Sequence, residues 1–281
     1  MDRVFDNMLV HLLRGDFTVD RSAIGYEAFT RNGKTYAYFG VFPALLRLLI
    51  VPFTNIAQAH VARLSCLSAL VIFVALQLRM LLIVHRSLPA PNQTPLFLGV
   101  IMVATVLSGP QLYILGAAMI YYEPILWSAA MAAGFNLIIV RTTFGAKRLR
   151  GCDLALLAGL AGLAINTRPS IGGALYLSTT LLIVWTVWRR YGPNRNTQQF
   201  LRSCTPFSSI LPAIAVLGLV LIAVVFINYE RWGNAFTFQD LNYYDEKFSG
   251  PNLIEMLHKY GQFNIGHLWI GALYYASGIP Y

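Results

Sequence analysis

Residues 153–188 read DLALLAGLAGLAINTRPSIGGALYLSTTLLIVWTVW, an apolar run of 36 residues broken by the tetrapeptide Asn166-Thr167-Arg168-Pro169. A bilayer core about 30 Å thick is crossed by roughly 20 apolar residues in a helix. A lone arginine is costly in lipid, and proline ends a helix. The run therefore predicts two membrane-spanning helices joined by a turn at residues 166–169.

Four further apolar runs flank this hairpin and are long enough to be considered as spans. They cover residues 64–84, 96–120, 124–140 and 207–228. The second run contains Ser108-Gly109-Pro110, a combination that is expected to kink a helix. Together with the hairpin, these runs predict an all-α, polytopic transmembrane helix bundle of about six spans plus interfacial helices.

The composition of the whole chain supports this class of protein. It is 57% hydrophobic and 12% charged, with a mean hydropathy of +0.57, whereas soluble domains carry about 25% charged residues. Because the basic residues behind the net charge of +9 sit in short loops between apolar runs, we read them as a signal of orientation and expect no nucleic-acid partner. The three cysteines lack the spacing of a disulfide framework or a zinc site, so no metal or other cofactor is indicated.

Two basic loops decide the expected orientation. They lie on either side of the hairpin, and the positive-inside rule places both in the cytoplasm; their basic residues are Arg141, Lys147, Arg148 and Arg150 in one loop, and Arg189, Arg190, Arg195 and Arg202 in the other. Counting spans outward then places Glu123 and Arg168 on the outer side, together with residues 1–40 and 229–281. We therefore expect a multi-pass protein of the inner (plasma) membrane with both terminal segments extracytoplasmic.

This scheme divides the chain into three parts. Residues 1–40 form an extracytoplasmic first loop with an amphipathic helix, residues 41–228 form the transmembrane bundle, and residues 229–281 form a second extracytoplasmic segment that we expect to be incomplete. Within the bundle part, the apolar stretch 41–54 spans only about 21 Å as a helix. We expect it to be interfacial or re-entrant, although a crossing here would move residues 1–40 into the cytoplasm.

The first loop carries three local signals. Apolar residues near its start predict a helix that lies on the membrane, Asn32-Gly33 predicts a turn, and an aromatic group is expected to meet the lipid; that group is Tyr36, Tyr38, Phe39 and Phe42.

Polar groups on the outer side are the candidate site residues. Asp2 and Asp6 lie four residues apart and share one helix face, where two carboxylates can act as a general base or bind a cation or a lipid-linked substrate; the alternative is a solvated face near a terminus. Arg168 could hold a phosphate through its planar fork of donors, or pair with Glu123 to fix the hairpin.

Five stretches in sequence order resemble the bacterial GT-C superfamily of membrane glycosyltransferases, nearest to its protein-mannosyltransferase-like and RgtA/B/C/D-like branches. They are Asp2-Arg3-Val4-Phe5 with LVHLLRGDF at 9–17, YAYFGVFPALL at 36–46, YEPILW at 122–127, GLAGLAINTRPS at 159–170 and NYERWGNAFTFQDLNYY at 228–244. Each motif is short and degenerate, and their order carries the resemblance.

The resemblance implies a GT-C-like fold and sugar transfer on the extracytoplasmic face. The donor would be a polyprenyl-phosphate-linked sugar, and the acceptor a hydroxyl of an envelope glycan, lipid or protein. Membrane lipids would be further partners of the protein. In the family, an aspartate of the first outer loop is the catalytic base; Asp2 matches this position best, and Asp6 is the reserve. Arg168 would correspond to donor-phosphate binding, with Glu123 beside it on the substrate side.

The chain also departs from the family pattern. Arg3 stands where members carry a second acidic residue, and the chain begins where a first span should have ended. We therefore expect a fragment, a misassigned start or a decayed copy, and in each case the chain by itself need not be active. The alternatives are a membrane transporter or lipid flippase, and a non-catalytic integral membrane protein.

Overall fold

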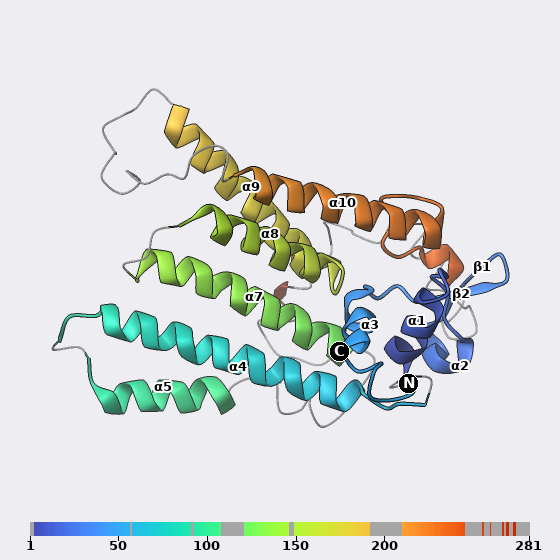
Figure 1. The fold of residues 1–281 in the computed structure, drawn as a ribbon, viewed down its shortest axis with the longest axis horizontal. Coiled ribbons are helices and arrows are strands. Elements are labelled where there is room, and N and C mark those ends of the chain that lie inside the picture. Colours follow the sequence, from blue (N-terminus) through green and yellow to red (C-terminus); the bar gives the residue numbers. More distant parts are fainter. Residues whose placement is uncertain are drawn as a thin grey trace.

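The computed structural model describes residues 3–56, 58–90, 93–107, 121–145, 149–191 and 210–244, with single residues near the C-terminal end. Its described part is mostly helical. Six helices run along the long direction of the molecule, and a small region of short elements closes one end (Figure 1). We call this region, residues 3–56 with residues 233–244, the cap.

Four helices are long and apolar enough to cross a membrane: α4 (Ala62–Ser87), α7 (Tyr122–Thr143), α9 (Pro169–Tyr191) and α10 (Leu211–Trp232). Two apolar helices are shorter, α5 (Pro95–Leu107) and α8 (Gly151–Ile165). At 1.5 Å per residue, α8 extends only about 22 Å, less than the bilayer core. About six spans were expected, and the described residues contain four helices of spanning length. Much of the predicted span 96–120 lies outside the described residues.

The predicted hairpin at 153–188 is confirmed as α8 and α9. Asn166 and Thr167 end α8 by bonding back to its carbonyl groups, at 3.0 Å to the oxygen of Gly162 and 2.7 Å to that of Leu163. Pro169 is the first residue of α9. At Gly172 an added Cβ would lie 2.0 Å from the backbone nitrogen of Ile165, so the absence of a side chain there lets α9 fold back closely on α8.

Small residues also let the bundle helices approach one another. Ala158 and Ala161 of α8 and Ala213 of α10 are fully buried in one apolar cluster with Leu157. Such close contacts between small residues are the usual basis of helix association in lipid, where burial of apolar surface drives little. The outward faces of α4, α9 and α10 expose large apolar side chains, as a lipid-facing surface does.

The cap contains short helices and one β-hairpin. Its elements are α1 (Val4–Leu12), α2 (Arg21–Ile24), η1 (Gly25–Glu27), β1 (Phe29–Arg31), β2 (Lys34–Tyr36), α3 (Phe42–Leu46), η2 (Arg47–Leu49) and η6 (Leu241–Tyr243). β1 and β2 are antiparallel, with Phe29 opposite Tyr36. Asn32 and Gly33 form the turn between them with φ of 50° and 73°, which confirms the predicted turn and matches the conformation that tight hairpins require.

Two expectations for the first loop are wrong in where they place apolar side chains. The apolar face of α1 does not lie against lipid, because Phe5 and Met8 are buried in the cap core. Of the expected aromatic belt, Tyr36 and Phe39 are buried, and Phe39 meets Phe5 edge to face with ring centroids 5.9 Å apart. The cap is large enough to form its own core, which removes these groups from any contact with the bilayer.

The continuously described parts of the four segments expected on the outer side, which end at Tyr244 in the last of them, lie together at the cap end. The backbone N–H of Phe42 donates to the carbonyl of Asn166 at 3.0 Å, and Nη1 of Arg231 donates to the carbonyl of Phe39 at 2.7 Å. α3 and η2 are three to five residues long, so the stretch 41–54 does not cross the bundle. The start of α7, the α8–α9 turn and the end of α10 therefore share one end with the cap.

Candidate functional site

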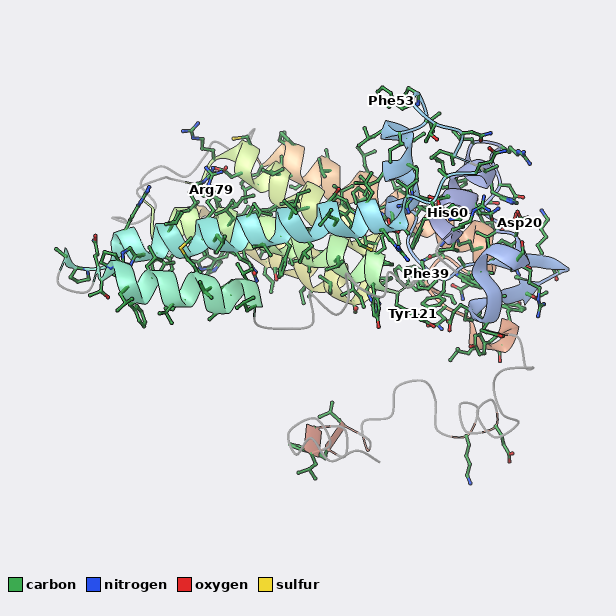
Figure 2. The ribbon with its side chains drawn as sticks, turned by 90° about the horizontal axis from the view of Figure 1, so that it is seen from below. Asp20, Phe39, Phe53, His60, Arg79 and Tyr121 are labelled. Carbon is green, nitrogen blue, oxygen red and sulfur yellow. The ribbon has the colours of Figure 1, made fainter. Side chains whose placement is uncertain are left out.

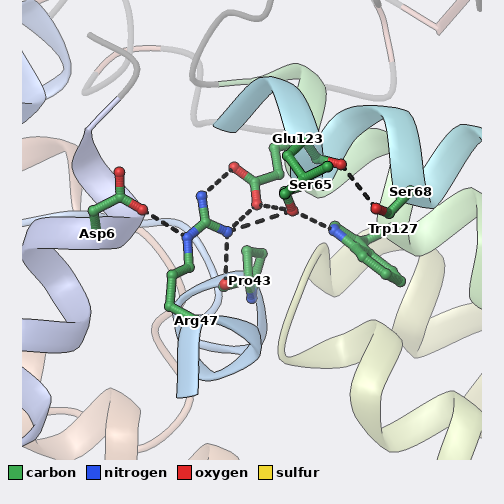
Figure 3. A network of polar contacts seen from close by, with 8 residues as sticks. Asp6, Pro43, Arg47, Ser65, Ser68, Glu123 and Trp127 are labelled. Carbon is green, nitrogen blue, oxygen red and sulfur yellow. Dashed lines mark hydrogen bonds and ion pairs between the residues drawn. The ribbon is translucent and has the colours of Figure 1, made fainter. Parts of the chain in front are cut away.

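A buried ionic network joins the cap to the bundle, with Arg47 at its centre (Figure 3). Nε of Arg47 donates to Oδ1 of Asp6 at 2.8 Å, and its two terminal nitrogens form a bidentate pair with Glu123, with Nη2 at 2.9 Å from Oε2. Nη1 also donates to the carbonyl of Pro43 at 2.8 Å. One guanidinium thus connects α1, α3 and α7.

The network continues into α4 and α7, two of the helices that are long and apolar enough to cross a membrane. Nε1 of Trp127, one turn below Glu123 on α7, donates to the hydroxyl of Ser65 on α4 at 2.9 Å. Ser65 in turn donates to Oε1 of Glu123. Each oxygen of Glu123 therefore has at least one donor, and α4 and α7 are linked to each other at the point where the cap rests on them.

Local sequence explains the position of Arg47. Pro43 is the second residue of α3 and lies in its first turn, where its fixed φ and missing N–H are tolerated. Arg47 follows one turn later, so its side chain can bond back to the Pro43 carbonyl. The guanidinium also lies over the Phe5 ring, 5.6 Å from the centroid, a favourable cation–π distance.

The charged side chains of this network are buried, so they are shielded from water and stabilised by one another. The side chains of Arg47, Asp6 and Glu123 are 1%, 1% and 2% exposed. Burial alone would lower the pKa of Arg47, but its hydrogen bonds and charge contacts with Glu123 and Asp6 raise that pKa above its ordinary value. The network holds two carboxylates and one guanidinium, and Oδ2 of Asp6 is buried without a hydrogen-bond partner among the described residues.

Arg168 lies in the turn between α8 and α9 at the same end of the bundle. Its side chain is partly exposed and forms no hydrogen bond or ion pair with the residues that the structure describes. Tyr38 lies close enough for the positive charge of Arg168 to act on its phenol. Glu123 pairs with Arg47, so the alternative in which Arg168 and Glu123 form an ion pair is not what the structure shows.

Tyr38 belongs to a small phenol cluster on the cap side of Arg168. Tyr121 hydrogen-bonds with Tyr38 and with the carboxylate of Glu27. Burial raises the pKa of both phenols, and the negative charge of Glu27 raises both further. These tyrosines are therefore neutral hydrogen-bonding groups at physiological pH.

The structure thus brings together some of the residues expected from sequence and leaves out others. Asp6 and Glu123 meet through Arg47, and Arg168 has no counter-ion within the described part of the chain. Asp2 lies outside the described residues. Arg47 was not among the expected site residues. The signal for it was a lone arginine in the apolar stretch 41–54, a position that requires a buried counter-ion.

The donor set favours an anionic ligand at Arg168 over a bound metal at the network. Among the described residues, no three His, Cys, Asp or Glu side chains cluster as metal ligands would. Arg47 pairs with one oxygen of Asp6 and with both oxygens of Glu123. The guanidinium of Arg168 has no hydrogen-bond or ion-pair partner among the described residues, so its donors can meet an oxyanion. No protein-family model, no curated protein and no solved structure matches this chain.

Proposed function

We propose that this chain is a GT-C-type membrane glycosyltransferase, or the remnant of one, that transfers a sugar from a polyprenyl-phosphate donor to an acceptor hydroxyl on the extracytoplasmic face. The observation that carries the proposal is Arg168. It is a partly exposed guanidinium at the cap end of the bundle, without an ion-pair partner in the described part of the chain. A lipid-linked donor presents a phosphate at this level of the membrane.

Phosphate binding suits Arg168 on chemical grounds. A guanidinium offers parallel N–H donors that match two oxygens of a phosphate, and it stays charged at any physiological pH. The leaving group in glycosyl transfer is that phosphate, so positive charge beside it stabilises the transition state. Arg47 cannot take this role, because its donors are used by Asp6, Glu123 and Pro43.

The general base of the proposal is Asp2, with Asp6 as the second candidate. In the structure, Asp6 commits one oxygen to Arg47 and is 1% exposed. Its contribution under this proposal is to hold α1 against the bundle, which makes it a positioning residue. Asp2 precedes α1 and supplies the carboxylate that accepts the proton of the attacking hydroxyl.

The proposed orientation places the cap outside. Arginines mark the opposite end of the bundle: Arg86 in the last turn of α4, Arg141 in the last turn of α7 and Arg150 at the start of α8. The positive-inside rule favours the cytoplasm for this end. In the same scheme, α5 and α8 complete a GT-C-like set of about six spans.

Transfer of radiolabelled sugar in membranes tests the proposal. The assay uses a panel of polyprenyl-phosphate sugars as donors, with endogenous acceptors. We expect Asp2→Asn to lower the rate about 10²- to 10⁴-fold and Arg168→Gln about 10²-fold. The matched controls Glu230→Gln and Arg14→Gln change exposed groups of the same charge and should transfer like the parent. Equal transfer by Asp2→Asn, Arg168→Gln and the parent would refute the proposal and favour a transporter, a flippase or a non-catalytic protein.

Sidedness is tested separately with Asp16→Cys and a membrane-impermeant maleimide. The partly exposed position 16 lies in the cap, whereas Cys152 is exposed at the opposite end and Cys66 is buried. In intact cells or spheroplasts we expect label at position 16 alone, and label at Cys152 only after the membrane is opened. The reverse pattern would place the cap in the cytoplasm and end the proposal.

A further inference from the structure

A second charged site lies at the end of the bundle remote from the cap. α4, α7 and α8 enclose a groove of about 420 Å³ whose lining is apolar except for Arg79 and Arg141. Figure 2 shows Arg79 on α4 well away from the labelled cap residues Asp20 and Phe39. A cavity of this size is within the range of small-molecule sites, which lies between about 300 and 1,000 Å³.

The sequence builds this groove from three helical stripes. Lining residues recur at spacings of three and four along each helix, which places them on one face. They include residues 72, 76 and 79 of α4, residues 127, 131, 134, 138 and 141 of α7, and residues 156, 160 and 163 of α8. From Trp127 to Arg141 the stripe on α7 extends about 21 Å, long enough for a lipid chain in one leaflet.

The two ends of the groove differ in character. At the cap end, the ring of Trp127 meets that of Phe42 edge to face with centroids 6.0 Å apart, directly below the Arg47 network. At the other end, Nη2 of Arg141 pairs with Asp153, but its Nε is buried without a partner in the described part of the chain. An anion beside this guanidinium could accept a hydrogen bond from Nε of Arg141.

Arg79 carries a charge that the described residues do not balance. It lies eight residues, or about 12 Å, before the end of α4. Its side chain is exposed and forms no ion pair with a described residue. Charged groups at such depth in a membrane are costly unless a partner accompanies them. Arg79, Arg141 and Asp153 together give the site a net charge of +1.

We propose that this groove binds an anionic glycerophospholipid, with its phosphate between Arg79 and Arg141 and one acyl chain along the apolar wall toward Trp127. A phosphodiester carries a single negative charge, which matches the surplus of +1 at the site. A phosphate monoester such as a polyprenyl phosphate carries about −1.5 to −2 at pH 7 and exceeds it. Ile72 and Leu156 on the groove wall are exposed, so this side of the groove faces the bilayer. The lipid therefore enters laterally.

Native mass spectrometry of the full chain in detergent tests the proposal directly. Phosphatidylglycerol and phosphatidylcholine with identical acyl chains are titrated separately, and the bound lipid is counted by mass. We expect phosphatidylglycerol to bind about tenfold more tightly, because only its headgroup leaves the phosphate charge uncompensated. Arg79→Gln should abolish this preference, whereas Arg86→Gln, which removes an exposed arginine of the same helix outside the groove, should keep it.

The apolar wall is tested at Gly134. A Cβ there would lie 3.5 Å from Cδ1 of Leu160 and 3.8 Å from Cδ1 of Leu76, so Gly134→Ala fits in ordinary contact and should bind phosphatidylglycerol like the parent. Gly134→Leu fills the groove and should reduce binding at least tenfold. The melting temperature of each variant without added lipid verifies that it is folded, and bound phosphatidylglycerol should raise it in the parent.

Three results would overturn the proposal. The first is equal binding of the two phospholipids by the parent. The second is unchanged binding by folded Arg79→Gln and Gly134→Leu. The third is displacement of phosphatidylglycerol by an equal or lower concentration of polyprenyl phosphate, which would assign the groove to that lipid. None of these readouts depends on sugar transfer.

Discussion

Replacing Arg47 by methionine should open the junction between cap and bundle. The substitution keeps much of the apolar stem and removes the charge, which leaves the carboxylates of Asp6 and Glu123 facing each other at 1% and 2% exposure. Removing one partner from a buried ionic network costs about 3–5 kcal/mol, because the remaining charges stay desolvated. The hydrogen bond to the Pro43 carbonyl, 2.8 Å long, is lost as well.

Cys66 provides a local reporter of this opening. It follows Ser65 on α4, is 0% exposed and packs beside the network. In a background with Cys152 and Cys204 changed to serine, the labelling rate of Cys66 measures how often the junction opens. A loss of 3–5 kcal/mol in opening free energy corresponds to labelling that is about 100- to 5,000-fold faster.

Two controls separate the charge effect from a general loss of stability. Arg63→Met removes an exposed arginine of α4, the helix that carries Cys66. Cys66 should be labelled at the parent rate in this variant. The triple variant Asp6→Leu/Arg47→Met/Glu123→Leu removes every charge of the network, and it should recover most of the protection, since apolar residues often replace a buried ionic network without loss. Labelling of Arg47→Met within about threefold of Arg63→Met would refute the structural role of the network.

Two further predictions concern the cap and its contact with the α8–α9 turn. Gly40→Ala would place a Cβ 1.8 Å from the carbonyl oxygen of Asn166, so we expect about 1–3 kcal/mol of destabilisation in equilibrium unfolding. The control Gly173→Ala, whose Cβ would meet nothing within 4 Å, should be neutral or stabilising. Equal stability of the two variants would contradict the close contact between Gly40 and Asn166. Burial raises the pKa of Tyr38 and Tyr121, so their contribution to stability is complete below their unfolded pKa of about 10 and is lost as pH rises through the higher folded values. The double variant with phenylalanine at both positions should flatten the alkaline decline of the melting temperature, and an unchanged decline would exclude these phenols as its cause.

The helices of the bundle could be predicted because each is specified by contiguous residues. The run 64–84 lies inside α4, and the break at Asn166-Thr167-Arg168-Pro169 coincides with the end of α8 and the start of α9. Hydropathy and proline placement act within one or two helical turns, so the helices that they predict do not depend on the tertiary arrangement. The length of α8 was harder to predict, because hydropathy does not specify the residue at which the helical hydrogen bonds begin.

The ionic network could not be predicted because its partners are far apart in the chain. Arg47 is separated from Asp6 by 41 residues and from Glu123 by 76, and no local pattern specifies which carboxylate a buried arginine meets. Glu123 therefore had two possible cationic partners at the same end of the bundle, Arg47 and Arg168. Arg79 was overlooked for a related reason, since a single charge within an apolar run of 21 residues does not disturb its recognition as a span.

The balance of charge at each end of the bundle decides which arginines can bind a phosphate. At the junction with the cap, two carboxylates surround Arg47, so the network carries a net charge of −1 and repels an anionic ligand. Arg168 has no such competitor among the described residues, and at the opposite end Arg79 and Arg141 outnumber Asp153. Under the two proposals, phosphate binding at the cap end therefore depends on Arg168, and lipid binding at the other end depends on Arg79. Arg168→Gln should then leave phosphatidylglycerol binding unchanged and Arg79→Gln should leave sugar transfer unchanged, a crossed pair of results that would establish two separate sites.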